Sequence, residues 1–78
     1  SPWARRAVRS RLARIAVALR TEREPISPDQ AWEEIRSGHW PKDPVLSRFL
    51  RGEGGENFLQ ELERALDSLY RYAKGGEL

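Results

Sequence analysis

Prolines and glycines divide this 78-residue chain into four segments, and this division most constrains how the chain can fold. Proline is tolerated in the first turn of a helix, whereas glycine commonly ends one. Ser-Pro or Asp-Pro pairs open the first three segments, and Ser27 precedes Gln30 at the spacing of a capping box. Pro25 stops the first segment, and glycines close the other three. The sequence therefore predicts helices over about residues 2–21, 28–37, 44–51 and 56–74, followed by a flexible C-terminal tail over residues 75–78.

Apolar residues recur at helical spacing within these segments, and none of the segments shows the period-two alternation of a half-buried strand. The apolar face of helix 2–21 is Val8, Leu12, Ile15 and Leu19, and that of helix 56–74 is Leu59, Leu62, Leu66, Leu69 and Ala73. We therefore predict an all-α fold in which residues 1–78 form a single domain, a compact bundle of four helices. The two long helices are expected to pack antiparallel, with the two short helices between them.

The composition offers no catalytic or metal-binding constellation. The chain has no cysteine, and its one histidine, His39, would need three converging carboxylates to hold zinc. Ser37 is close to His39 in sequence, but a nucleophile needs a base that a third group orients. We expect no enzyme activity, no cofactor, no metal and no small-molecule substrate. The longest uncharged stretch of helix 2–21, Ile15 to Leu19, is far shorter than the roughly 20 residues that span a bilayer, so we expect a soluble, cytoplasmic protein.

Charge is distributed unevenly along the chain. Residues 1–20 contain six arginines and no acid, residues 21–52 have a net charge of −1, and residues 53–78 have a net charge of −3. At 100° per residue, one side of the first helix collects Arg5, Arg6, Arg9 and Arg20, and the other side has Arg11 and Arg14. These arginines could track the phosphates of a nucleic acid. Alternatively, helix 56–74 packs against them and provides the acidic partners Glu56, Glu61, Glu63 and Asp67.

The segment Ile26–Gly52 can be interpreted as a helix-turn-helix. Its second helix contains Leu46-Ser47-Arg48-Phe49-Leu50-Arg51-Gly52, which resembles the serine-arginine and terminal-glycine pattern in the recognition helices of bacterial repressor families. The resemblance implies that Ser47, Arg48 and Arg51 face the major groove of DNA. It covers about a third of the chain, and the connection between its helices is about two residues longer than in those repressors. One hypothesis is therefore a small DNA-binding regulator that uses helix 44–51 and the arginine face Arg5, Arg6, Arg9 and Arg20.

The second half of the first helix is apolar almost all round. Ala13 and Val17 lie opposite the predicted core face, and a helix that is apolar on both sides must be buried on both sides. Helix 44–51 or another chain could cover that second side. Trp3 lies there too, either as an interface anchor or folded onto the end of helix 56–74 near Tyr70 or Tyr72.

The other two tryptophans, Trp32 and Trp40, are expected to pack in the core between the short helices and helix 56–74. Our leading hypothesis is a non-catalytic protein–protein interaction module that forms a homodimer or docks a protein partner. The predicted interface is Trp3, Ala13, Val17, Tyr70 and Tyr72.

Overall fold

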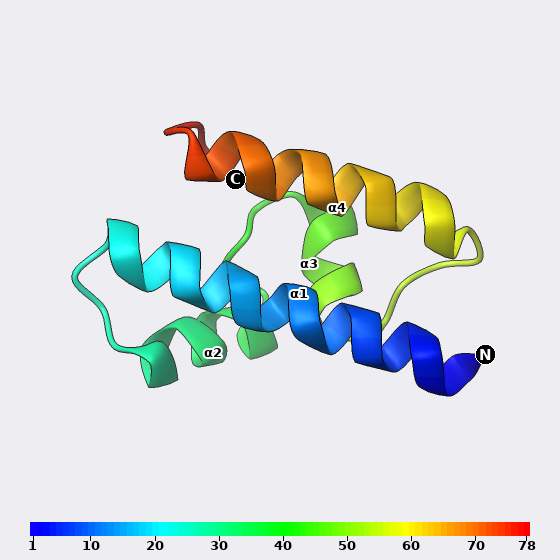
Figure 1. Cartoon of the computed structure of the whole chain (residues 1–78). Coiled ribbons are helices and arrows are strands. Elements are labelled where there is room, and N and C mark those ends of the chain that lie inside the picture. Colours follow the sequence, from blue (N-terminus) through cyan, green and yellow to red (C-terminus); the bar gives the residue numbers. More distant parts are fainter.

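Four α-helices and no strand make up the computed structural model, which describes residues 1–78 (Figure 1). This confirms the all-α fold class. The helices are α1 (Pro2–Arg23), α2 (Pro28–Ser37), α3 (Pro44–Leu50) and α4 (Phe58–Ala73). None of them combines the length and the apolar character required to cross a membrane.

The helix ends follow the capping chemistry of the sequence. Ser27 accepts a hydrogen bond from the amide of Gln30 at 3.1 Å, and the Gln30 side chain accepts one from the Ser27 amide at 2.9 Å, so the capping box is confirmed. Gly38 ends α2 in the left-handed conformation, with φ 83°, as predicted. The Asp43 carboxylate accepts a hydrogen bond from the Val45 amide at 3.0 Å and caps α3.

Two helix ends differ from the prediction by two residues, and the C-terminal ends of α3 and α4 each come one residue earlier than predicted. Helix α1 continues to Arg23 because the restriction on the residue before Pro25 falls on Glu24, which is extended at φ −122° and ψ 147°. Helix α4 begins at Phe58 rather than Glu56, because the side chain of Asn57 accepts a hydrogen bond from the Gln60 amide at 3.2 Å and caps the helix there.

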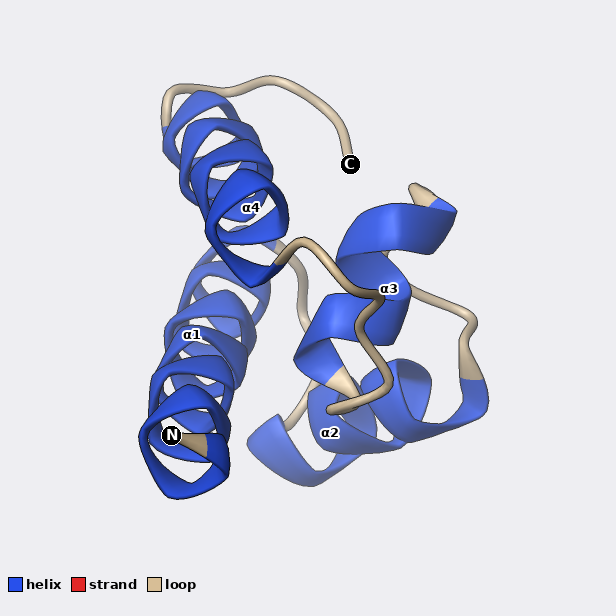
Figure 2. Ribbon diagram, turned by 90° about the vertical axis from the view of Figure 1, so that its right-hand side faces the viewer, coloured by secondary structure: helices blue, strands red, loops and turns tan.

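The helices form two layers. Helices α1 and α4 lie side by side in one layer, and α2 and α3 form the other (Figure 2). The prediction that α1 and α4 pack antiparallel is wrong, because both run from right to left in Figure 1. Arg5 near the start of α1 lies over the ring of Phe58 at the start of α4, and Arg23 at the end of α1 donates to the carbonyl of Tyr72 near the end of α4. The chain returns through the α2–α3 layer and so enters α4 at the end where α1 began.

The core lies between the two layers and draws on every helix. Its thirteen apolar side chains are Leu12, Ala13, Ala16, Val17, Ala31, Ile35, Trp40, Leu46, Phe49, Leu50, Ala65, Leu69 and Tyr72. Trp40 is 5% exposed and its ring lies 5.5 Å from that of Tyr72, so its predicted core position is confirmed. Trp32 is only half-buried and packs against the edge of the core. Phe49 is fully buried and packs 5.7 Å from the ring of Phe58.

The core face of α1 differs from the predicted one. The structure buries Ala13, Ala16 and Val17, whereas Ile15 is 44% exposed and Val8 and Leu19 are half-buried. Helix α1 has neighbours in both layers, and small alanine side chains let the backbone of a second helix approach closely. The core face of α1 is therefore rotated toward the alanines: Leu12 of the predicted face stays buried, and Ile15 lies outside.

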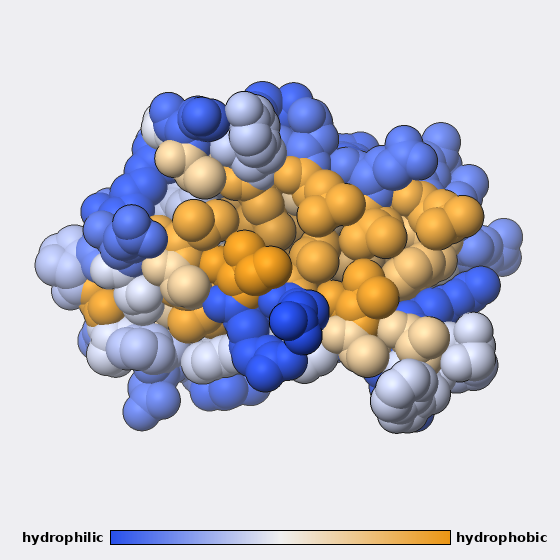
Figure 3. Space-filling model, in the orientation of Figure 1, coloured by the Kyte–Doolittle hydropathy of each residue, from blue (hydrophilic) through white to orange (hydrophobic).

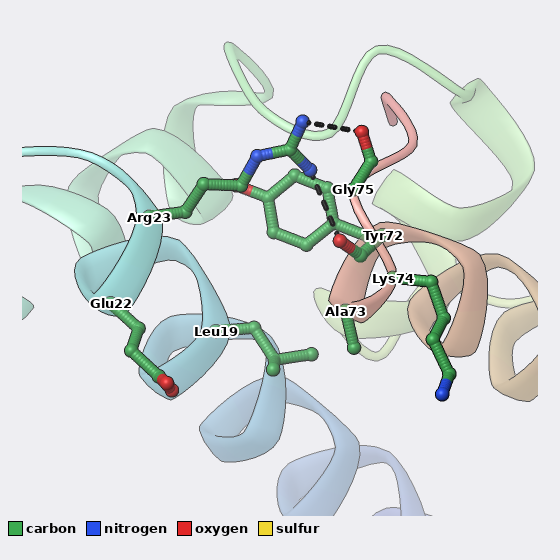
Figure 4. A pocket seen from close by; sticks show the side chains of 7 residues that line it. All are labelled: Leu19, Glu22, Arg23, Tyr72, Ala73, Lys74 and Gly75. Carbon is green, nitrogen blue, oxygen red and sulfur yellow. Dashed lines mark hydrogen bonds between the residues drawn. The ribbon is translucent and has the colours of Figure 1, made fainter.

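The C-terminal tail, predicted to be flexible, lies against the helices. The Arg23 guanidinium lies 4.4 Å from the centre of the Tyr72 ring and donates to the carbonyl of Gly75 at 2.9 Å, across a shallow pocket at the shared end of α1 and α4 (Figure 4). Lys42 donates its amide to the carbonyl of Leu78 at 3.3 Å, and the Leu78 side chain packs on the core. The tail therefore joins the ends of both layers.

Candidate interaction surface

An apolar strip runs along the outer side of the α1–α4 layer, the side turned away from α2 and α3. Figure 3 shows it as a continuous band of hydrophobic atoms between hydrophilic borders. Ile15, Leu59, Leu66 and Tyr70 are 44%, 69%, 50% and 64% exposed. We call this surface the α1–α4 face; it comprises Val8, Ile15, Leu19, Leu59, Leu62, Leu66 and Tyr70. An exposed patch of adjoining apolar side chains with polar borders is typical of a protein-binding surface.

The strip exists because α4 is apolar on two adjoining sides. Ala65, Leu69 and Tyr72 are buried against the core. At 100° per residue, Leu59 and Leu66 fall outside that buried arc, beside the exposed side of α1. A helix with so wide an apolar arc needs partners on more than one side. Within this chain the α2–α3 layer covers only the inner side (Figure 2).

Opposite charges border the two long edges of the α1–α4 face. On the α1 side, Arg11 and Arg14 are exposed and take part in none of the ion pairs of the chain. On the α4 side, Glu63 is exposed and unpaired, while Asp67 forms an ion pair with Arg71 one turn further on. We call Arg11 and Arg14 the basic edge and Glu63 and Asp67 the acidic edge.

The structure corrects three of the five residues predicted to contact a partner. Ala13, Val17 and Tyr72 are 2%, 6% and 2% exposed, so other helices of the same chain already cover them. Trp3 and Tyr70 are exposed, at 71% and 64%. They do not meet, because Trp3 lies in the first turn of α1 whereas Tyr70 lies near the end of the parallel helix α4. Trp3 therefore does not fold onto the end of α4 near Tyr70 or Tyr72.

Three of the four residues of the arginine face of α1 have partners within the chain, although Arg5 and Arg6 are exposed. The Arg9 side chain is buried, and its guanidinium lies 4.7 Å from the ring centre of Phe49 and 5.3 Å from that of Phe58. Arg5 lies 5.4 Å from the ring centre of Phe58. Aromatic faces attract guanidinium groups at such distances, so these two arginines bind rings of their own chain. Arg6 is exposed.

Arg20 also has its partners within the chain. It forms an ion pair with Glu34 of α2 at 3.1 Å and lies 5.0 Å from the centre of the Trp40 ring. The hydrogen bond to the Glu34 carboxylate raises the pKa of Arg20 above its usual value.

The predicted acidic partners on α4 are wrong. No ion pair joins the α1 arginines to Glu56, Glu61, Glu63 or Asp67; Glu61 instead accepts from the Gly55 amide at 3.1 Å.

The buried guanidinium of Arg9 gives a prediction about stability. Its Nη1 atom is buried without a hydrogen-bond partner, which costs desolvation energy. The burial of its aliphatic stem and its contacts with the aromatic rings stabilise the fold. Arg9→Met keeps most of the stem and removes the charge, so we expect the free energy of unfolding to change by less than about 1 kcal/mol. Arg9→Ala also removes the stem and should cost about 2 kcal/mol. Urea denaturation measures both; equal losses for the two variants would contradict this interpretation.

The residues of the resemblance to repressors do not form one exposed row. Ser47 is 4% exposed, and its hydroxyl accepts a hydrogen bond from Nη1 of Arg51 at 2.8 Å. Arg51 also forms an ion pair with Glu53 at 3.0 Å. Arg48 alone of the three is exposed without a partner in the chain. The predicted position of Ser47 facing a major groove is therefore wrong.

Ser37 and His39, which are close in sequence, are also in contact. Oγ of Ser37 lies 2.7 Å from Nδ1 of His39 on the exposed surface.

Comparison with known protein families identifies one family to which the chain is similar. A family model described as a family of unknown function, DUF7269, matches residues 1–75. The chain belongs to DUF7269. No curated protein and no solved structure matches the chain. The DUF7269 match includes all four helices, so both edges and every residue of the α1–α4 face lie within the part of the chain that the family model matches.

The sequence-based predictions did not include this surface, although they named every residue of the α1–α4 face. Leu59, Leu62 and Leu66 were assigned to the core because their spacing fits a helix-packing seam. The available signal was the length of that seam together with Phe58, Ala65 and Tyr72 on its flank, which made α4 too broadly apolar for a single neighbour.

Proposed function

We propose that this DUF7269 chain is a non-catalytic protein–protein interaction module that binds a protein through the α1–α4 face. The observation that carries this proposal is the strip of exposed aliphatic side chains, including Ile15, Leu59 and Leu66, which no helix of the chain covers. Leaving such side chains in water contributes nothing to folding, and burying each of them against a partner is worth about 1.5 to 3 kcal/mol. The partner is expected to present a complementary apolar surface of packed helices.

The proposal keeps the mode of action predicted from the sequence but moves the surface. The earlier interface relied on Ala13 and Val17, which are buried, whereas the α1–α4 face uses the opposite side of α1. Of the residues first predicted, only Tyr70 stays on the surface that we propose, because Trp3 falls outside the arc of Val8, Ile15 and Leu19. The DNA-binding alternative stays a prediction. The burial of Ser47 and the engagement of Arg51 within the chain give it no support.

Site-specific photo-crosslinking tests the proposal in cells that express the chain. A photoreactive amino acid in place of Leu66 is expected to give a discrete cross-linked protein product. The same group in place of Trp3, which is even more exposed but lies off the face, is the matched control and should give none. Adding Leu59→Gln to the Leu66 probe should lower the yield at least several-fold, because it places an amide in the apolar strip. Identical products from both probes, or none from either, would show that the face does not bind a protein.

The same surface predicts an unusual mutational profile for stability. Leu59 and Leu66 are 69% and 50% exposed, so Leu59→Gln and Leu66→Gln should each change the free energy of unfolding of the isolated chain by no more than about 0.5 kcal/mol. Chemical denaturation at low protein concentration measures this. A loss above about 2 kcal/mol in either variant would mean that the strip is part of the folding core.

A further inference from the structure

The two edges of the α1–α4 face carry opposite charges at the same level along the helices. Arg5 meets Phe58 at one end of the α1–α4 pair, and Arg23 meets Tyr72 at the other. The middle turns of the two parallel helices are therefore side by side, and these contain the basic edge on α1 and the acidic edge on α4. Each edge points away from the other helix of its own layer, so the two do not neutralise each other within the chain.

We infer that the partner on the α1–α4 face is a second copy of this chain, related by a two-fold axis parallel to α1 and α4. This inference rests on the proposed function. A two-fold axis along the helices places α1 of one copy on α4 of the other. Each basic edge, Arg11 and Arg14, then borders the acidic edge, Glu63 and Asp67, of the other copy. Because the interface is isologous, this complementary pairing occurs twice.

The alternative two-fold axis, across the helices, gives the opposite electrostatic result. It would place α1 on α1 and α4 on α4, so that Arg14 borders Arg14 and Glu63 borders Glu63. Like charges in direct apposition disfavour an interface, whereas complementary charges favour it and fix its register. The charge pattern therefore selects the arrangement with all four interface helices parallel.

The size of the face suits a stable dimer. The whole molecule measures 36 × 23 × 18 Å, and the α1–α4 layer runs along its length (Figure 1). The broad side of the molecule therefore has a projected area of at most about 800 Å², comparable with the roughly 800 Å² that each partner buries in an interface of standard size. The apolar strip occupies the middle and the charges the borders, which is the usual anatomy of a protein interface. In the dimer, Leu59 and Leu66 meet the α1 side chains Val8 and Ile15 of the other copy.

A charge-reversal cycle tests both the partner and the axis. Arg14 and Glu63 suit the cycle because both are exposed and neither has an ion-pair partner in the chain. Sedimentation equilibrium of the purified chain at low ionic strength gives the dimer dissociation constant. Arg14→Glu alone and Glu63→Arg alone should each weaken dimerisation about tenfold, since each reversal acts twice in the dimer. The two changes together in one chain should restore the affinity, and added salt should reduce all of these differences.

The outcomes separate this inference from the proposed function. Leu59→Gln with Leu66→Gln is the matched control and should make the chain monomeric whatever the axis, with the fold intact by circular dichroism. A monomeric native chain whose Leu66 probe still cross-links a different protein would overturn the dimer and leave the proposed function standing. A monomeric chain without any cross-link would overturn both. A dimer in which both reversals are neutral, or in which the double variant is not restored, would overturn the parallel axis.

Discussion

Phe49→Ala is expected to lower the free energy of unfolding by about 3 to 5 kcal/mol. Phe49 is fully buried, and its ring packs against Phe58 while the Arg9 guanidinium covers one side at 4.7 Å. The substitution removes a filled volume that α1, α3 and α4 share. A chain of this length has a total stability of about 4 to 12 kcal/mol, so this single change should remove about a quarter or more of it.

Urea denaturation followed by circular dichroism measures the effect of Phe49→Ala. Phe49→Leu keeps an apolar side chain at the site and should cost less than about 2 kcal/mol, which separates the cavity from the loss of the aromatic ring. Trp3→Ala is the exposed aromatic control, at 71% exposure, and should change the stability by no more than about 0.5 kcal/mol. A loss below about 1 kcal/mol for Phe49→Ala would contradict the position of this ring at the junction of three helices.

The helix positions could be predicted because local chemistry sets them. The capping box of Ser27 and Gln30, the left-handed Gly38 and the cap at Asp43 all involve residues a few positions apart. The one cap that the prediction omitted, Asn57, is local too. The sequence placed the start of α4 two residues earlier, at Glu56, because the glycine-rich stretch ends there.

The orientation and rotation of the helices could not be predicted in the same way. Their determinants are contacts between residues far apart in the chain, such as Arg5 with Phe58 and Arg23 with Tyr72. Periodicity identified two apolar sides of α1 but not which one faces the chain itself. The larger side chains suggested the face of Val8, Leu12, Ile15 and Leu19. Of these only Leu12 is fully in the core, because close packing of α1 against its neighbours turns the side with Ala13 and Ala16 inward.

The arginines illustrate why a charge count says little about a binding site. Six arginines in residues 1–20 predicted either a phosphate-binding face or ion pairs with α4. A long aliphatic stem allows the guanidinium to fold back over an aromatic ring, and Arg9 and Arg5 do so on Phe58. Of the α1 arginines within residues 1–20, Arg6, Arg11 and Arg14 contact neither a ring nor an acid of the chain, and only Arg6 belongs to the face that the DNA-binding hypothesis uses.

Trp40→Ala is the second change for which we expect a loss of about 3 to 5 kcal/mol in the free energy of unfolding. The Trp40 ring is 5% exposed, lies 5.5 Å from the Tyr72 ring of α4 and is covered by the Arg20 guanidinium of α1 at 5.0 Å. The Trp40 ring therefore connects the segment between α2 and α3 to both helices of the α1–α4 layer. Removing it should loosen the α1–α4 pair at the end where the tail is held.

The matched control for Trp40→Ala is Trp32→Ala on α2. Trp32 is half-buried at the edge of the core, so the same truncation there should cost only about 1 to 2 kcal/mol. Because the α1–α4 face needs both helices in register, Trp40→Ala should also weaken binding through that face, whereas Trp32→Ala should not. Urea denaturation and sedimentation equilibrium of both variants measure the two effects. Equal losses of stability, or an α1–α4 face that still binds normally in Trp40→Ala, would show that the ring does not hold the two helices of this face together.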